Sequence, residues 1–255
     1  MAPDPRIAAA FAAARDYDAH AGVQRRVATA LAARIAALPL PPDPRLLEIG
    51  CGTGFLTEAL LERGIGGKWL VTDLAPDMVA RAQAKLAGRA DLTFAVLDGE
   101  HGPRPDAAPF DLICASLAVQ WFGALEPALD RLLGWLAPGG HLIVTTLGAD
   151  TFAEWRAAHE AEGVEPGTLP FPSAAALGAL LPCRQAAAPL VETVRADHAD
   201  ARAFLRSVKA IGAGTPRTGH RPLPPAKLRR IMARFEQAGA RASYEVVTCH
   251  FRSEA

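Results

Sequence analysis

The chain has 255 residues, and its 27 basic and 27 acidic side chains give a formal net charge of zero. Half of the residues are hydrophobic, which is enough for one well-packed domain with a small lid. The neutral balance argues against nucleic-acid binding, and the absence of an apolar run of about 18 residues argues against a membrane span. The four cysteines lack metal-site spacing, and the first residues lack the layout of a signal peptide, so we expect a reduced, cytoplasmic protein.

The N-terminal part of the chain predicts helix. Residues 7–38 are rich in alanine, and Val23, Val27 and Leu31 follow one helical face. A cluster of four prolines within residues 39–44 then ends the helix. We expect residues 1–38 to form a helical cap that packs on the sheet or covers a pocket.

Residues 46–54 predict the end of a buried strand followed by a tight turn. Three glycines stand at alternate positions: Gly50, Gly52 and Gly54. A helix is expected from Phe55 to Leu61, so the unit presents backbone N–H groups to an anionic or polar ligand. Glycine suits such a turn because φ becomes positive there and because a Cβ would collide with the ligand.

The glycine spacing separates two classes of cofactor. A dinucleotide fingerprint requires G-x-G-x-x-G, but its third position falls on Phe55 here. The pattern that starts at Glu48 instead resembles the first motif of class I S-adenosylmethionine-dependent methyltransferases. An ordinary glycine turn in another α/β protein is the alternative.

Two further strands are expected to end in a carboxylate. Residues 68–73 end at Asp73, roughly twenty residues after the turn, where a carboxylate accepts both hydroxyls of a ribose. Residues 92–100 contain Asp98, which is placed to accept from an adenine amino group. The alternative for both side chains is a solvated polar residue at a strand end.

The fourth and fifth strands complete a parallel pattern. Residues 110–121 predict a strand and the turn after it, where ligands bind in open α/β sheets. A helix over 124–136, a turn at 138–140 and a strand over 141–146 follow. Alternating strands and helices indicate a parallel sheet with right-handed crossovers.

The second half of the chain is less regular. Thr151 and Glu154 suggest a capping box at the start of a helix. The remaining expected elements are a helix over 173–181, a strand over 189–197, helices over 199–211 and 225–238, and a closing strand over 243–252. We expect the last two helices to cover the pocket as a lid.

This expected lid is strongly basic. Residues 199–241 contain only two acidic side chains, Asp200 and Glu236, but ten basic ones: Arg202, Arg206, Lys209, Arg217, Arg221, Lys227, Arg229, Arg230, Arg234 and Arg241. The surface is either a solvated helical face or a binding site for an acidic partner or an anionic substrate.

Six segments spread over nearly the whole chain follow a common pattern: residues 17–21 with Gln24 and Arg25, and residues 47–54, 116–121, 151–154, 205–213 and 244–247. In these segments the chain resembles the malonyl-acyl-carrier-protein O-methyltransferases of biotin synthesis. The match is looser in the loop at 215–217 and at the end, 249–252. These departures concern the substrate rather than the cofactor.

The resemblance implies a fold, a cofactor and a reaction. The fold is a mostly parallel sheet of seven strands with an antiparallel last strand, in one domain over 1–255 with a cofactor-binding core at 45–147 and a basic lid at 199–240. The cofactor is S-adenosyl-L-methionine, and no metal is expected. The reaction methylates the free carboxylate of a malonyl thioester, carried by an acidic acyl-carrier protein or by coenzyme A. The oligomeric state stays open.

The expected site residues fall into three groups. For the cofactor they are Glu48, Gly50, Cys51, Gly52, Gly54, Asp73, Leu74, Asp98, Gly99 and Ser116. For the substrate they are Tyr17, Gln24, Gln120, Trp121, Arg206 and Lys209, although Trp121 also fits a plain core position. A malonyl carboxylate is already ionised at pH 7, so no general base is required, and Tyr17 and His20 remain only as candidates for positioning it.

Two other functions are compatible with the sequence. The same scaffold could methylate a different small diacid. Proteins that resemble this family also act as assembly factors of respiratory complexes, some of them hydroxylating a protein arginine. The intact acid and glycine pattern favours a working cofactor site without excluding either alternative.

Overall fold

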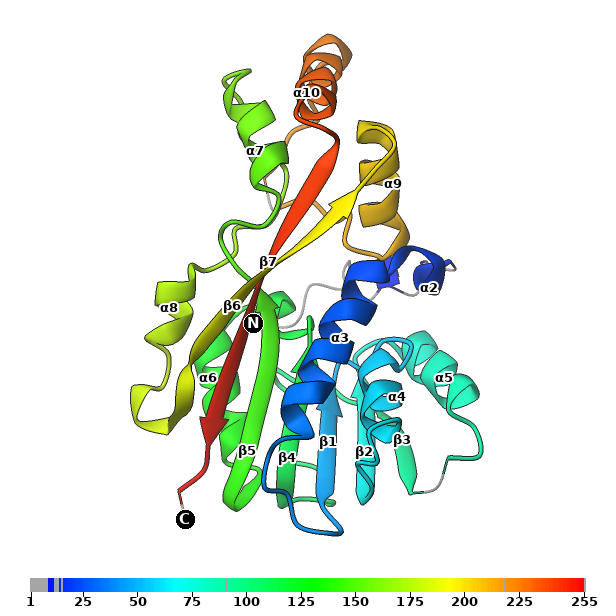
Figure 1. Ribbon diagram of the computed structural model, residues 1–255, viewed down its shortest axis with the longest axis vertical. Coiled ribbons are helices and arrows are strands. Elements are labelled where there is room, and N and C mark those ends of the chain that lie inside the picture. The colour runs from blue at the N-terminus through cyan, green and yellow to red at the C-terminus, as the bar shows by residue number, and fades with distance from the viewer. Residues whose placement is uncertain (1–8, 12–13, 15, 90, 218, 255) are drawn as a thin grey trace.

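Seven strands form one mixed sheet in the computed structural model, which describes residues 9–11, 14, 16–89, 91–217 and 219–254 (Figure 1). The strand order is β3-β2-β1-β4-β5-β7-β6. Their bounds are β1 Arg45–Ile49, β2 Lys68–Asp73, β3 Leu92–Val96, β4 Phe110–Ser116, β5 Leu136–Leu147, β6 Gln185–Asp197 and β7 Arg241–Arg252. Strands β1 to β5 pair in parallel, whereas β7 runs antiparallel to β5 and β6. The expected fold class is confirmed.

Helices cover both faces of the sheet, so its central strands are apolar on both sides. The first buried cluster joins α3 (Gly22–Ile35) and α4 (Phe55–Leu61) to one face through Leu31, Leu60 and Leu112. The second joins α6 (Leu125–Leu133) and α8 (Ala174–Gly178) to the other face. Helix α5 (Pro76–Lys85) packs beside β2 and β3.

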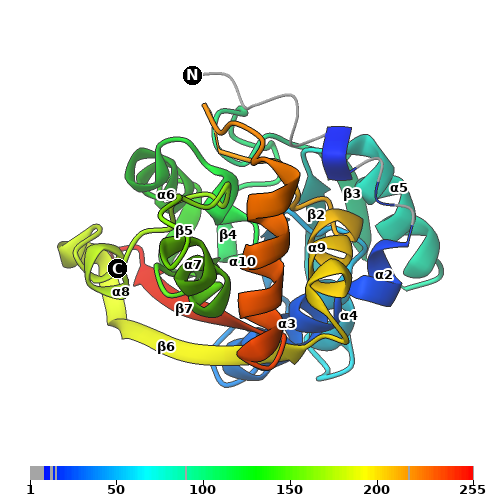
Figure 2. The ribbon, with the colours of Figure 1, turned by 90° about the horizontal axis from the view of Figure 1, so that it is seen from above.

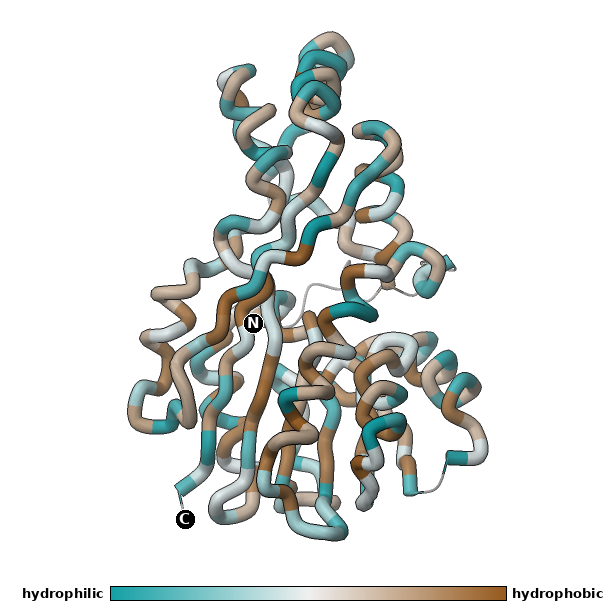
Figure 3. The backbone as a smooth tube through the Cα atoms, in the orientation of Figure 1, coloured by the Kyte–Doolittle hydropathy of each residue, from teal (hydrophilic) through white to brown (hydrophobic). Residues whose placement is uncertain are grey.

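Three helices stand above the carboxyl ends of the parallel strands (Figures 1 and 2). They are α7 (Ala153–Glu160), α9 (Ala201–Ala210) and α10 (Pro225–Gln237). A separate aromatic cluster around Trp155, Phe204 and Phe235 holds them to each other and to β7. Figure 3 shows hydrophobic strands in the sheet and hydrophilic stretches along α10.

The described part of the N-terminal region is helical at residues 9–11 and then forms two separate helices. Helix α2 (Tyr17–His20) is separated from α3 by Ala21. Helix α3 ends at Ile35, three residues before the end of the predicted helical segment 7–38. The earliest part of the predicted cap lies outside the described residues. Within the described ranges, no helix combines the length and apolar character needed to cross a lipid bilayer.

The start of β5 differs from the prediction. Helix α6 ends at Leu133, and residues 138–140 continue the strand instead of forming a separate turn. The register shifts between the Phe110–Leu136 and Leu112–His141 pairs, which accommodates the extra residues as an irregularity. The Pro-Gly-Gly sequence predicts a turn from local propensity alone. The observed strand at these residues depends instead on pairing with β4, which lies elsewhere in the sequence.

The predicted capping box is wrong. Phe152, with φ at +59°, is the residue before α7, and no side chain caps that helix. The Glu154 carboxylate instead accepts from the backbone N–H and the hydroxyl of Ser243 on β7. The Thr151 side chain contacts Glu245 on the same strand, so tertiary hydrogen bonds replace the local cap.

Candidate active site

The glycine turn after β1 has the backbone that its sequence predicts. Gly50, Gly52 and Gly54 have φ values of +69°, +54° and +87°. A Cβ on Gly50 would lie 2.4 Å from the Cβ of Ala118, so the neighbouring loop leaves no room there. A Cβ on Gly52 would meet nothing closer than the Tyr17 hydroxyl oxygen at 3.8 Å. Gly52 therefore keeps a side of the turn open for a ligand.

This open side faces a cavity, here named the turn cavity. It is lined by residues 48–53, 73–75, 97–100 and 116–118 together with Phe11, Tyr17, Gln24, Ala28, Phe55, Leu56, Met78, Trp121 and Phe122. The lining thus joins the carboxyl ends of four parallel strands, β1 to β4, to the N-terminal helices. Ligands bind at this edge of an open α/β sheet.

Asp73 at the end of β2 fixes the turn. One of its carboxylate oxygens accepts from Gly52 N–H and the other from Ala75 N–H, each at 2.8 Å. Burial raises the pKa of this carboxyl, against hydrogen bonds that lower it. Each oxygen keeps a second lone pair, so the carboxylate is still able to accept two hydroxyl groups from a ligand.

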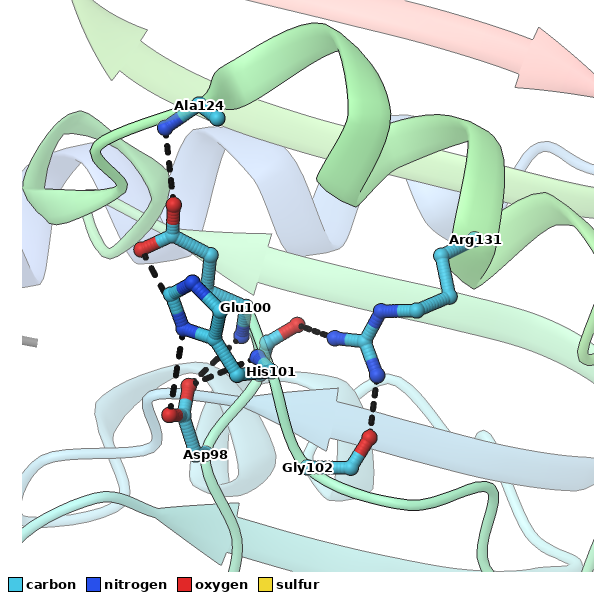
Figure 4. Close-up of polar contacts among 7 residues, drawn as sticks. Asp98, Glu100, His101, Gly102, Ala124 and Arg131 are labelled. Atoms are coloured by element: carbon cyan, nitrogen blue, oxygen red, sulfur yellow. Dashed lines mark hydrogen bonds and ion pairs between the residues drawn. The ribbon is translucent and has the colours of Figure 1, made fainter. Parts of the chain in front are cut away.

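The loop after β3 is held by a network of polar contacts (Figure 4). Asp98 accepts from the backbone N–H of Glu100 at 2.8 Å and of His101 at 3.0 Å, and its other oxygen lies 3.4 Å from His101 Nδ1. The buried Glu100 accepts from Ala124 N–H at 2.7 Å. This network fixes Asp98 and Gly99 at the rim of the turn cavity.

Arg131 on α6 clamps the same loop from outside. Its guanidinium donates to the carbonyl oxygens of Gly99, at 2.7 Å, and of Gly102 (Figure 4). It also stacks over the Trp135 ring. A Cβ on Gly99 would lie 2.4 Å from Ile49 Cγ2, so the loop also sits close against β1. The position of Asp98 therefore depends on a residue that does not line the cavity.

A second cavity, the helix cavity, continues from the first toward α7 and α9. Its volume of about 890 Å³ lies in the range typical of ligand sites. Its further lining includes Gln120, Leu147, Phe152, Trp155, His159, Leu205, Lys209, His220 and Tyr244. Among the described residues, five line both cavities: Phe11, Tyr17, Gln24, Leu117 and Trp121.

These five shared residues, the junction, contain no charged side chain. The Tyr17 ring stacks on Phe55, and Phe11 packs edge-on against Trp121. Burial and the nearby carboxylates of Asp73 and Asp18 raise the pKa of the Tyr17 hydroxyl, which therefore stays protonated as a donor. The junction is therefore a largely apolar boundary between the two cavities, with a few neutral hydrogen-bonding groups.

The comparisons with known proteins agree with this geometry. A family model described as a methyltransferase domain matches residues 47–142. The chain is 38% identical over 245 residues to the malonyl-acyl-carrier-protein O-methyltransferase of Magnetococcus marinus, covering 95% of this chain and 90% of that protein. The chain belongs to this O-methyltransferase family.

Two further comparisons concern a longer relative and a solved structure with a similar fold. The O-methyltransferase chain is 46% identical over 245 residues to the biotin biosynthesis bifunctional protein BioCD of Bordetella avium, but it spans only 51% of that longer protein. Its fold resembles that of the YcgJ protein of Bacillus subtilis, with a TM-score of 0.62, 15% identity and coverage of 88% of this chain and 98% of that one. The latter likeness shows the fold alone.

The structure gathers most of the expected site residues of this family member around the two cavities. The turn cavity contains Glu48, Gly50, Cys51, Gly52, Asp73, Leu74, Asp98, Gly99 and Ser116, and the helix cavity contains Gln120 and Lys209. Tyr17, Gln24 and Trp121 lie at the junction. Gly54 lines neither cavity but starts α4 with its left-handed backbone.

Two expected residues lie elsewhere. His20 and Arg206 are exposed and line neither cavity. His20 lies three residues after Tyr17 on the short helix α2. Arg206 lies on the side of α9 away from the buried Phe204. The structure therefore does not support either residue as a group that touches the substrate.

The sequence analysis missed most of the apolar lining. Met78, Leu97 and Phe122 line the turn cavity, and Trp155 and Tyr244 line the helix cavity. Their apolar spacing is indistinguishable from that of core residues in the sequence. Among the described residues, no cluster of three His, Cys, Asp or Glu side chains is arranged as a metal site.

We expect Arg131→Met to weaken cofactor binding without changing the chemistry. Loss of the guanidinium frees the Gly99 and Gly102 carbonyls and loosens the Asp98 loop, so the dissociation constant should rise about tenfold, in line with two lost charge-assisted hydrogen bonds. Isothermal titration measures the affinity, and the turnover number at saturating cofactor should stay within about twofold. Arg131→Lys should recover part of the affinity. An unchanged dissociation constant for Arg131→Met would contradict this role.

We expect Glu48 to make stability fall with rising pH. The side chain is buried beside β1 and accepts from the Thr57 hydroxyl at 2.5 Å, and burial raises its pKa from 4.5 to about 7. Between these values the folded state holds more protons than the unfolded state, so stability is lost as pH rises through this window and is level above it. The loss amounts to at most about 3 kcal/mol.

Urea unfolding at pH 4.5 and pH 8 tests this expectation. Glu48→Gln keeps the shape and stays neutral, so its stability should fall less than that of the unaltered protein over this interval. The difference between the two proteins isolates Glu48 from the histidines and other groups that titrate in both. Equal pH dependence in the two proteins would remove Glu48 as the source.

Proposed function

We propose that this protein transfers the methyl group of S-adenosyl-L-methionine to the free carboxylate of a malonyl thioester on an acidic acyl-carrier protein. The observation that supports the proposal is the junction, the set of residues that lines both the turn cavity and the helix cavity. A methyl donor held by the glycine turn and an acyl group held below α7 and α9 would meet there. The names of the relatives at 38% and 35% identity support this substrate.

The turn cavity fits the proposed cofactor. Asp73 offers two oxygens to a ribose diol, and Asp98 and the neighbouring backbone lie where an adenine edge would reach. Gly52 supplies the open backbone surface for the amino-acid part. The bound cofactor would supply an activated methyl group on a sulfonium ion.

The chain's own part in the reaction is orientation and exclusion of water. A malonyl carboxylate needs no base, so the protein has to hold one of its oxygens in line with the methyl group at near-attack distance. The Tyr17 hydroxyl and the Gln24 amide are the neutral donors that line the junction. Phe11, Leu117 and Trp121 give the junction apolar groups that displace water.

The uncharged junction suits an anionic nucleophile. An ion pair with arginine or lysine would lower the reactivity of the attacking oxygen, whereas neutral donors orient the carboxylate and leave more of its charge in place. Lys209, His159 and His220 lie in the helix cavity outside the shared lining. We assign these groups to the thioester end of the substrate. We assign the carboxylate to Tyr17 and Gln24 rather than to Arg206, which lines neither cavity.

The size of the helix cavity favours a carrier-bound thioester over a small diacid. A free diacid would need only the space around the junction, whereas the cavity of about 890 Å³ continues to α9 and to the loop that follows it. The complete set of acids and glycines around the turn cavity favours a methyltransferase over an assembly factor that has lost the cofactor. We place the reaction in the cytoplasm.

Rescue of a biotin-requiring bacterial strain that lacks this methyltransferase tests the proposal. Expression of the unaltered chain should restore growth without biotin, and an equally abundant Gly52→Val variant should not. Growth with both proteins, or with neither at normal protein levels, would count against the proposed function.

A further inference from the structure

The basic side chains around α9 and α10 divide into two groups in the structure. Four of them form ion pairs with acidic residues of the same chain. Arg230 and Arg234 both pair with Glu162 just after α7, at 2.7 and 2.8 Å. Arg217 pairs with Glu165, and Arg241 with Asp197. These four brace the upper helices and the ends of β6 and β7, so their charge is largely matched.

The second group includes a cationic row along α9. Arg202, Arg206 and Lys209 are spaced by four and three residues, which places them on one side of the helix. All three are exposed, and the described residues offer them no hydrogen bond or ion pair. Phe204 and Ala201 on the other side of the helix are buried, so the row faces solvent.

This row ends at the mouth of the helix cavity. Lys209 lines the cavity, as does Leu205, which is 36% exposed and stands between Arg202 and Lys209 along the helix. The C-terminal end of α9 leads into Gly212, whose backbone packs against Phe11 at the junction. Arg202 lies about 10 Å farther from this end along the helix axis. Arg202, Leu205, Arg206 and Lys209 are named the α9 face.

We propose that the α9 face is the docking surface for the acyl-carrier protein, through acidic side chains on that partner. The inference rests on the proposed function and names the surface through which the substrate is delivered. A carrier protein docked on this face would have its thioester arm at the cavity mouth next to Lys209. The exposed Leu205 supplies a small apolar contact within the cationic row.

The length of the row favours a protein partner over free coenzyme A. Lys209 stands at the mouth of the helix cavity, and Arg202 and Arg206 extend the positive surface away from it along α9. A partner with an acidic surface of its own contacts all three side chains at once, together with Leu205. Such a charged surface mainly raises the association rate and makes binding sensitive to salt.

The charge-reversal variant Arg202→Glu/Arg206→Glu tests the proposal without altering the cavity lining. KM for malonyl-carrier protein should rise about tenfold or more at low salt, and KM for malonyl-coenzyme A should stay within about twofold. The matched control Lys227→Glu/Arg229→Glu reverses two charges on α10 that have no hydrogen bond or ion pair with the described residues, and it should leave both values nearly unchanged. Thermal unfolding verifies that both variants are folded.

A direct measurement of carrier-protein binding tests the docking surface independently of methyl transfer. The dissociation constant of fluorescent malonyl-carrier protein, measured by anisotropy, should rise in the α9 variant and not in the α10 control, whether or not methyl transfer occurs. Unchanged carrier binding in the α9 variant overturns the docking surface. An equal loss of activity of the α9 variant toward malonyl-coenzyme A and malonyl-carrier protein also overturns it. If the unaltered protein binds the carrier protein but transfers no methyl group, that result counts against the proposed function alone.

Discussion

Gly52→Val should raise the dissociation constant for S-adenosyl-L-methionine at least about a hundredfold while the protein stays folded, because the new side chain fills the ligand space. A Cβ at Gly52 meets no protein atom closer than 3.8 Å, so the added methyl groups project into the turn cavity rather than into the core. The positive φ of +54° adds strain of about 1–2 kcal/mol for any L side chain. Calorimetric titration measures the affinity, and thermal unfolding measures the strain.

Gly88→Val is the matched control for backbone strain. Gly88 has φ at +79°, and a Cβ there meets nothing within 4 Å, but it lies after α5 and outside both cavities. This variant should lose stability comparable to that of Gly52→Val and retain full affinity. Equal losses of affinity in the two variants would mean that strain, rather than the filled turn cavity, explains the effect.

Asp73→Asn should raise the dissociation constant for the cofactor about a hundredfold, since hydrogen bonds to a charged group contribute about 1.5–3 kcal/mol each. The carboxylate accepts from Gly52 N–H and Ala75 N–H at once, and an amide has only one oxygen to offer. The amide nitrogen would face one of these donors and disturb the glycine turn as well as the ribose contact.

Asp77→Asn provides the comparison for Asp73. It makes the same chemical change at an exposed residue in the first turn of α5, four residues along the chain. Its cofactor affinity should equal that of the unaltered protein. If Asp73→Asn bound the cofactor as tightly as Asp77→Asn, the ribose role of Asp73 would be wrong.

The turn and the strand-end acids are predictable from the sequence because each depends on local geometry. Glycines at alternate positions indicate a turn with positive φ. A carboxylate after each of two strands indicates polar groups at the edge of the sheet where a ligand binds. Each signal lies within a few residues of sequence. The parallel part of the sheet follows from the alternation of strands and helices, whereas the order of the strands was not predicted. The antiparallel last strand was expected from the resemblance and not from any local signal.

Features that depend on distant residues could not be predicted. Arg131 reaches the loop of Gly99 and Gly102 across 32 and 29 residues of chain, and no sequence pattern marks that contact. Glu154 has the spacing of a capping residue but finds Ser243 89 residues away.

The place of a polar residue on its helix also determines whether its side chain reaches a cavity. Tyr17 and His20 are three residues apart on α2, and so are Arg206 and Lys209 on α9. In each pair only one residue lines a cavity. The sequence identifies the segments that carry the site, whereas the packing of each helix selects the residue that faces the ligand.

Intact-mass spectrometry of malonyl-carrier protein after incubation with the purified chain and S-adenosyl-L-methionine tests the central claim most directly. The meeting of the two cavities at Tyr17, Gln24 and Trp121 predicts that the malonyl group gains the mass of one methylene, as a methyl ester, and that acetyl-carrier protein, which lacks the free carboxylate, gains none. No mass gain on the malonyl group, or an equal gain on both carrier proteins, would contradict transfer to a malonyl carboxylate at this junction.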